Sequence, residues 1–141
     1  MKPDCVLCRP SPGEQLVLER EKWRIIRVDD VLYPGFFRVV WQAHVAEMTQ
    51  LPLSDCQELM TVVFAVERAI RDVMCPDKVN LASLGNMVPH LHWHVIPRFA
   101  DDAHFPESVW GVKQREPDPA VLEKRRMQQR EVAEAIRRML A

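Results

Sequence analysis

The sequence lacks the features that mark membrane-spanning and secreted proteins. No apolar run approaches the ~20 residues that a membrane-spanning helix requires. The first residues, Met1-Lys2-Pro3-Asp4-Cys5, contain no apolar h-region, so we expect no secretory signal. Four cysteines in 141 residues do not form a disulfide framework. We therefore expect the thiols to be reduced and the protein to be cytoplasmic, with no membrane partner.

The sequence also lacks an excess of charge of either sign. It has 19 basic and 20 acidic residues and a formal net charge of -1. Such a chain has no bulk electrostatic attraction to nucleic acid, so we expect no nucleic-acid partner. An anionic ligand must instead be recognised by a local group of side chains.

The composition is that of one folded domain. Hydrophobic residues make up 48% of the chain and charged residues 28%, which is typical of a globular protein that buries its own core. We expect a single domain over residues 1–141. Its core should span about residues 4–99, followed by a C-terminal loop and helix over 100–141.

Hydrophobic periodicity predicts an α+β fold. Strands are predicted over residues 15–19, 23–28, 36–41, 79–84 and 90–96. A capping box from Ser54 to Gln57 predicts the start of a long helix, and Asp118-Pro119 predicts the start of a final one. This order of elements favours a five-stranded, mostly antiparallel sheet with the long helix packed on it and a C-terminal helix.

Three of the five histidines lie within the run Pro89-His90-Leu91-His92-Trp93-His94-Val95-Ile96-Pro97. Residues two apart on a strand point to the same face, about 6.6 Å apart along the strand. The three imidazoles therefore share one face, while the intervening Leu91, Trp93 and Val95 take the opposite, apolar face. We expect Pro97 to end this strand.

The histidine face admits three interpretations, which spacing alone leaves open. It could meet solvent, although threonine, lysine or glutamate is more usual there. His-x-His pairs on strands also chelate metals. The interpretation we favour is phosphate chemistry, with one imidazole as nucleophile and its neighbours as hydrogen-bond donors.

The pattern His-φ-His-φ-His-φ-φ, in which φ is apolar, is matched at all seven positions from His90 to Ile96. With the preceding Gly85-Asn86 turn and the upstream helix, the chain resembles the histidine triad (HIT) family from about residue 4 to residue 99. The resemblance implies a HIT-like fold. It also implies a nucleotide hydrolase or nucleotidyl transferase that attacks the α-phosphorus of a nucleoside phosphoramidate or dinucleoside polyphosphate, with no cofactor required for catalysis.

The resemblance also implies roles for individual residues. His92 would be the nucleophile that carries the nucleotidyl group, His94 would hydrogen-bond the phosphate, and His90 would orient its neighbours. Asn86 would lie near the phosphate, and Asp29 would hold the ribose hydroxyls. Because free histidine has a pKa of about 6.5, we expect neutral and protonated imidazoles to coexist near pH 7, with an imidazolium facing a phosphoryl oxygen.

Two positions depart from the family pattern. Many members carry a further histidine soon after a Pro-Gly pair, but here Pro34-Gly35 is followed by Phe36. Members often have proline where this chain has Trp41. The sequence does not show what replaces that histidine, so substrate preference is left open.

Cys5 and Cys8 have the spacing of half a tetrahedral zinc site. His44 matches the position where zinc-binding relatives supply a third ligand, and His90 could be the fourth. The alternative is a pair of reduced, partly buried thiols. If zinc binds there, we expect it to be structural rather than catalytic.

Two other functions remain open beside the enzyme. One is a zinc-containing scaffold or regulator that binds nucleotides without significant turnover. The other is a redox protein that uses Cys5 and Cys8, although nothing around that pair resembles a thioredoxin-like βαβ unit. From the family resemblance we also expect a homodimer.

Overall fold

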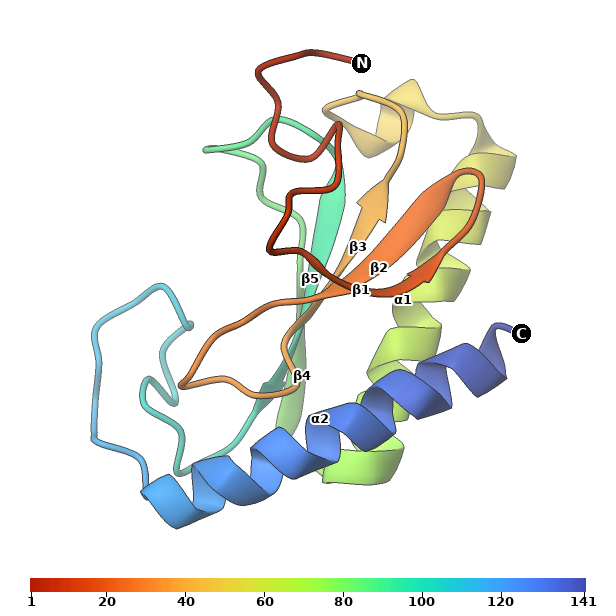
Figure 1. Cartoon of the computed structure of the whole chain (residues 1–141). Coiled ribbons are helices and arrows are strands. Elements are labelled where there is room, and N and C mark those ends of the chain that lie inside the picture. The colour runs from red at the N-terminus through yellow and green to blue at the C-terminus, as the bar shows by residue number, and fades with distance from the viewer.

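The computed structural model describes all residues from Met1 to Ala141. The elements, in chain order, are β1 (Gln15–Glu19), β2 (Trp23–Arg27), β3 (Phe37–Trp41), the 3₁₀ turn η1 (Met48–Gln50), α1 (Leu53–Met74), β4 (Lys78–Ala82), β5 (His92–Arg98) and α2 (Pro119–Met139). The strands form one sheet in the order β1-β2-β3-β5-β4, and every neighbouring pair is antiparallel (Figure 1). The predicted α+β architecture is confirmed.

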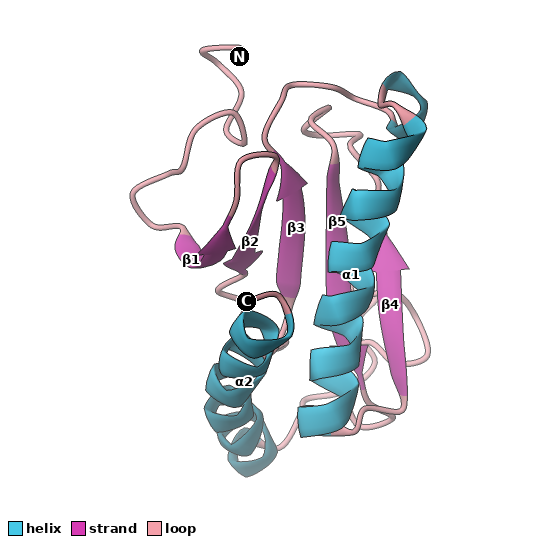
Figure 2. Cartoon of the chain, turned by 90° about the vertical axis from the view of Figure 1, so that its right-hand side faces the viewer, coloured by secondary structure: helices cyan, strands magenta, loops and turns pink.

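Both helices cover the same face of the sheet (Figure 2). The alternation along β3 shows why: Phe37, Val39 and Trp41 join the main core, which also contains residues of α1 and α2. Val40 lies in a separate small cluster with Leu7 and Ile26, on the opposite face. Figure 1 shows that the N-terminal segment and the loop between β5 and α2 lie on this second side. The face without helices is therefore the one that can hold a site.

The two predicted helix starts had different outcomes. At α2 the Asp118 side chain accepts a hydrogen bond from the backbone N–H of Ala120 at 2.9 Å, with Pro119 in the first position, as predicted. The capping box at Ser54 is wrong, because α1 begins one residue earlier, after Pro52, without a side-chain cap. A capping box instead starts η1, where Glu47 and Gln50 satisfy each other's backbone N–H groups.

The histidine strand is also shifted from its predicted bounds. β5 begins at His92 rather than His90, and it continues through Pro97 to Arg98. Pro97 is tolerated because the pairing with β3 ends at Val95, so the missing N–H lies where no β3 neighbour requires it. On the other side Pro97 still pairs with Val79 of β4.

The loop over residues 100–116 is irregular, as predicted, and it is fixed by a buried ion pair. The Arg98 guanidinium donates to both carboxylate oxygens of Asp102, at 2.8 and 3.1 Å, and both side chains are almost fully buried. Burial alone would raise the pKa of Asp102, but Arg98 and three backbone N–H donors hold that pKa at about 2. The loop is therefore attached to the end of β5.

No helix combines the length and apolar character needed to cross a bilayer.

Candidate active site

The three triad histidines lie at the start of β5, on the face away from the helices. His92 pairs with Val40 of β3, and His94 pairs with Arg38. Their side chains are 7% and 5% exposed, and His90, just before the strand, is 1% exposed. Leu91 and Val95 lie in the main core, and Trp93 packs against it, so the predicted alternation is confirmed.

A hydrogen bond to a main-chain carbonyl fixes the tautomer of His92. Its Nδ1 lies 2.6 Å from the carbonyl oxygen of His90. Because a carbonyl oxygen can only accept, Nδ1 carries the proton. Burial lowers the pKa of His92, which favours the neutral ring. The Nε2 atom of His92 therefore holds a free lone pair.

His94 has the opposite tautomer. The Arg38 guanidinium donates from Nε to Nδ1 of His94 at 3.3 Å, so this nitrogen is an acceptor and the proton lies on Nε2. Burial, with smaller contributions from His92 and Arg38, lowers the pKa of His94 to about 3. Neutral His94 therefore offers an N–H donor beside the lone pair of His92, with ring centres 4.8 Å apart.

The permanent cation of this site is Arg38, which we did not predict. We expected a protonated histidine to face the phosphate, but burial is the first cause that lowers the pKa of all three triad residues. That expectation is therefore wrong for the free protein. Burial also lowers the pKa of Arg38, yet a guanidinium stays charged near neutral pH. The sequence feature that could have identified Arg38 is its position as a single arginine inside the apolar run from Phe36 to Trp41.

Phe36, which stands in place of the family's additional histidine, belongs to the same arrangement. It is 3% exposed, and its ring makes an edge contact with the His94 ring at 5.6 Å between centres. The Arg38 guanidinium lies 5.9 Å from the centre of the Phe36 ring. Phe36 by packing and Arg38 by hydrogen bonding thus hold the His94 ring from two sides.

His92 and His94 open onto a cavity of about 460 Å³. Its lining residues are Val6, Leu7, Arg38, Leu84, Asn86, Met87, Val88, His92, His94 and Trp110. The structure thus brings the predicted Asn86 together with His92 and His94. Trp110, on the loop between β5 and α2, was missed because the sequence of that loop has no regular pattern.

Asp29 lies in an adjacent, smaller cavity of about 220 Å³ after the end of β2. This second cavity shares Val6, Leu7 and Arg38 with the first. Asp29 is exposed and its carboxylate has no hydrogen-bond partner within the chain, so it is free to receive a ligand. Arg38 stands on the boundary between the histidines and Asp29.

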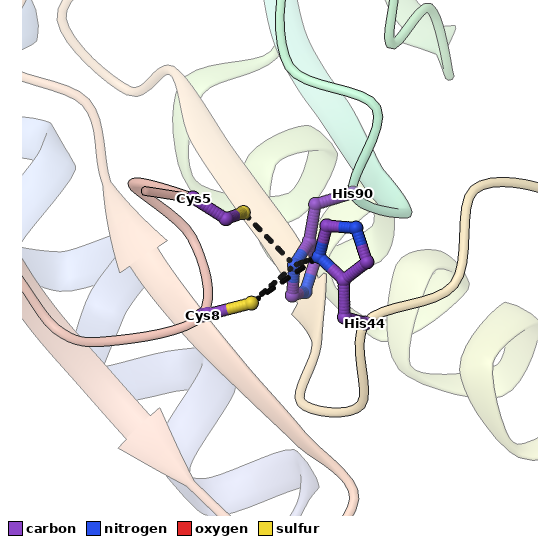
Figure 3. A group of neighbouring side chains, drawn as sticks. All are labelled: Cys5, Cys8, His44 and His90. Carbon is purple, nitrogen blue, oxygen red and sulfur yellow. Dashed lines mark hydrogen bonds between the residues drawn. The ribbon is translucent and has the colours of Figure 1, made fainter. Parts of the chain in front are cut away.

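His90 faces a different group of side chains. Its Nε2 atom donates to the carbonyl oxygen of Trp41, which leaves a lone pair on Nδ1. This Nδ1 lies 3.4 Å from Cys5 Sγ, 3.6 Å from Cys8 Sγ and 3.2 Å from His44 Nδ1 (Figure 3). The structure therefore brings together all four of the predicted metal ligands.

The four ligand atoms have the spacing that zinc requires. They lie within 4.8 Å of one another, and His44 Nδ1 is 3.2 Å from Cys8 Sγ. A zinc tetrahedron with ordinary Zn–N and Zn–S bonds has edges of about 3.3 to 3.8 Å. Two thiols and two imidazoles are also a donor set that zinc prefers. The contacts of 3.2 to 3.6 Å match these edges, and side-chain shifts of about 1 Å would bring the widest pair into a tetrahedral zinc site.

Comparisons with known proteins agree with this geometry. The HIT domain model matches residues 10–101. A protein from Mycobacterium tuberculosis named AP-4-A phosphorylase is 33% identical over 110 residues, which is 73% of this chain. That match covers 56% of the relative, so the chain spans about half the length of the curated relatives it matches.

Solved structures have the same fold. A histidine triad protein from Bradyrhizobium japonicum is 30% identical, with a TM-score of 0.70 over 89% of each chain. A Zn-bound histidine triad family protein from Mycobacterium smegmatis is 22% identical, with a TM-score of 0.64 over 96% of this chain and 95% of that one. With the family model matching more than half of the sequence, and with the triad in place, the chain belongs to the histidine triad family.

Proposed function

We propose that this protein is a nucleotide hydrolase or nucleotidyl transferase that acts at the α-phosphate through a nucleotide bound covalently to His92. The observation that carries the proposal is the hydrogen bond from His92 Nδ1 to the His90 carbonyl. It leaves the lone pair of His92 Nε2 free and fixes the ring. The family, and the relative named AP-4-A phosphorylase, support nucleotide chemistry in general.

The proposed reaction has two balanced steps. In the first, His92 Nε2 attacks the α-phosphorus, and the leaving group departs with the electron pair of its bond and takes up a proton. In the second, the oxygen of water or of another acceptor attacks the phosphorus. The bond to Nε2 then breaks, its electron pair returns to His92, and the acceptor loses a proton. His94 Nε2–H, Asn86 and Arg38 would donate to the phosphoryl oxygens, so no cofactor is required.

The leaving group is tested by a direct screen. We include both classes that the family resemblance implies, nucleoside phosphoramidates and dinucleoside polyphosphates, together with adenylyl sulfate. Mass spectrometry of the products should detect the nucleoside monophosphate from at least one class. A protein that binds these compounds but releases no monophosphate would instead be the scaffold or regulator.

Asp29 is the proposed ribose contact. Its exposed carboxylate can accept hydrogen bonds from both ribose hydroxyls, a charge-assisted contact worth about 1.5–3 kcal/mol. Asp29→Ala should therefore weaken ribonucleotide binding by roughly 10- to 150-fold and weaken deoxyribonucleotide binding clearly less, because deoxyribose keeps only the 3′-hydroxyl. Calorimetric titration with matched AMP and deoxy-AMP measures both. Equal losses for the two sugars would remove Asp29 from the ribose site.

Zinc at Cys5, Cys8, His44 and His90 is the proposed structural metal. Because the ion would join the N-terminal segment to two loops, its removal should lower the melting temperature more than it lowers turnover well below that temperature. Cys8→Ser should reproduce the loss of stability and of bound zinc, and Cys75→Ser, at an exposed cysteine, should change neither. Immediate loss of turnover in EDTA with unchanged stability would make the metal catalytic and contradict the proposed mechanism.

We also propose a homodimer. β4 is an edge strand that pairs only with β5, and Leu81 on β4 and Phe64 on α1 are 36% and 53% exposed. A second copy that pairs along this edge would cover both. Light scattering should therefore give twice the chain mass of 16.4 kDa, and Phe64→Glu should weaken the dimer while Met127→Glu, on α2, should not. A 16.4 kDa particle at micromolar concentration would contradict it.

A further inference from the structure

Trp110 lies at the wall of the histidine cavity and contacts the triad directly. Its ring centre is 5.0 Å from that of His94, at an angle of 69° between the planes. The side chain is nevertheless 53% exposed, which leaves much of the indole surface free. A large, half-exposed aromatic ring beside buried histidines is unusual, because most aromatic surface of this size is covered in a folded protein.

The loop that carries Trp110 is held on both sides. Before it, Arg98 donates to the carbonyl oxygen of Glu107 at 2.6 Å, in addition to its ion pair with Asp102. After it, Arg115 donates to the carbonyl oxygens of Asp102 and Phe105, at 2.7 Å each. These contacts fix the backbone on both sides of Trp110. A ligand that binds to the indole therefore does not need to order the loop.

The wall around Trp110 is apolar. Leu84 and Met87 line the same cavity and are 56% and 93% exposed. Arg38 is the only permanent cation among the lining residues, and it already donates to His94. A polyphosphate chain carries several negative charges and is usually held by several cations. The part of this cavity beside Trp110 is therefore suited to an apolar ring.

The two neighbouring cavities could receive the two substituents of a phosphorus bound at His92. Asp29, the proposed ribose contact, lies in the smaller cavity, and Trp110 lies in the larger one. The nucleoside and the leaving group extend from the same phosphorus in different directions, and the chain offers one cavity for each.

We propose that Trp110 is a specificity-determining residue that forms the aromatic wall of the leaving-group site, so that an aromatic leaving group is preferred to a small aliphatic one. The inference rests on the proposed function, because it takes the His92 side of the cavity as the place of the phosphate. It adds the chemical class of the group that departs and names the residue that selects it.

Three adenosine 5′-phosphoramidates test this inference, with phenethylamine, 2-cyclohexylethylamine or methylamine as the leaving amine. They share the nucleotide and the bond that is broken, so only the group that faces Trp110 differs. For the wild type, kcat/KM should be roughly 10-fold higher with phenethylamine than with methylamine, with the cyclohexyl compound between them. Trp110→Ala should remove this preference, so that the three compounds are cleaved with kcat/KM values equal within about 2-fold, and Trp110→Phe should keep most of it.

Val112→Ala provides the matched control, because Val112 lies on the same loop, is 75% exposed and lines neither cavity. Its selectivity should equal that of the wild type. An equal fall of all three rates in Trp110→Ala would place the indole on the nucleotide side and overturn the inference. Turnover by the wild type with no aromatic preference would also overturn it, while leaving the proposed function intact.

Binding of the same compounds to His92→Asn provides a readout that does not depend on turnover. Calorimetric titration should show tighter binding of the phenethylamine compound, and Trp110→Ala in the same background should abolish the difference. If the wild type cleaves neither these compounds nor the dinucleoside polyphosphates and adenylyl sulfate of the screen above, but this binding preference is present, the proposed function fails and the aromatic site stands. If neither cleavage nor preference is found, both are wrong.

Discussion

Replacement of His92 by asparagine should lower kcat by roughly 10⁴-fold or more, because it removes the nucleophile and leaves only direct attack by water. The structure makes this prediction specific to one atom. The Nδ1–H group is committed to the His90 carbonyl, so Nε2, which keeps its lone pair, is the atom that we propose attacks the phosphorus. An asparagine amide can still donate to that carbonyl but has no nucleophilic nitrogen. Steady-state and single-turnover assays measure the loss.

Three controls separate lost chemistry from lost structure. His92→Asn should keep the wild-type melting temperature, its zinc content and its affinity for AMP, because none of the four metal-facing side chains changes. His104→Asn should retain activity, because His104 contacts Tyr33 and lies outside the histidine cavity. His92→Gly should regain part of its activity in added imidazole. A His92→Asn protein with near wild-type turnover would remove His92 from the mechanism.

The second large effect is expected at Arg38. Arg38→Gln should lower kcat/KM by roughly 10²- to 10³-fold, the usual loss when one charged or preorganised donor is removed from a transition state. The change deletes the only permanent cation of the cavity and also weakens the donor that fixes the His94 tautomer. Most of the loss should therefore appear in kcat, because charge at the phosphorus is greatest in the transition state.

Arg38→Lys is the informative companion variant. Lysine keeps the positive charge but lacks the planar guanidinium, which can donate to His94 and, as proposed, to a phosphoryl oxygen at the same time. Arg38→Lys should therefore recover only part of the activity. Arg68→Gln, at an exposed position on α1, provides the matched control for loss of a charge. If Arg38→Gln raised KM without changing kcat, Arg38 would contribute to substrate binding and not to the transition state.

The fold was largely predictable because its signals are local. The alternation from His90 to Ile96, the periodicity of α1 and the Asp118-Pro119 cap are each encoded within a few residues. The errors also have local causes. Pro97 was expected to end β5, yet it lies beyond the end of the β3 pairing and does not interrupt the sheet. The capping box at Ser54 matched a pattern, but Pro52 already starts that helix.

The site was predictable only where a motif marks it. The triad follows from the motif, whereas Asn86 and His44 were named through resemblance. Nothing local links His44 to Cys5, Cys8 and His90. Arg38 enters the site through the β3–β5 register, which places it opposite His94. Trp110 reaches the cavity because the irregular loop that carries it folds around Asp102. Register and loop packing depend on contacts between distant segments, so neither residue could be recognised from its own neighbourhood.

The central claim is that the nucleotide is transferred to His92 before water or another acceptor attacks. The most direct measurement is a rapid quench of the wild type with a substrate labelled at the α-phosphate, followed by peptide mapping under conditions that preserve phosphoramidates. We expect the label on His92 within the first turnover, and its decay should match the appearance of the nucleoside monophosphate. Label on His94, or product formed in the first turnover without labelled protein, would contradict the account.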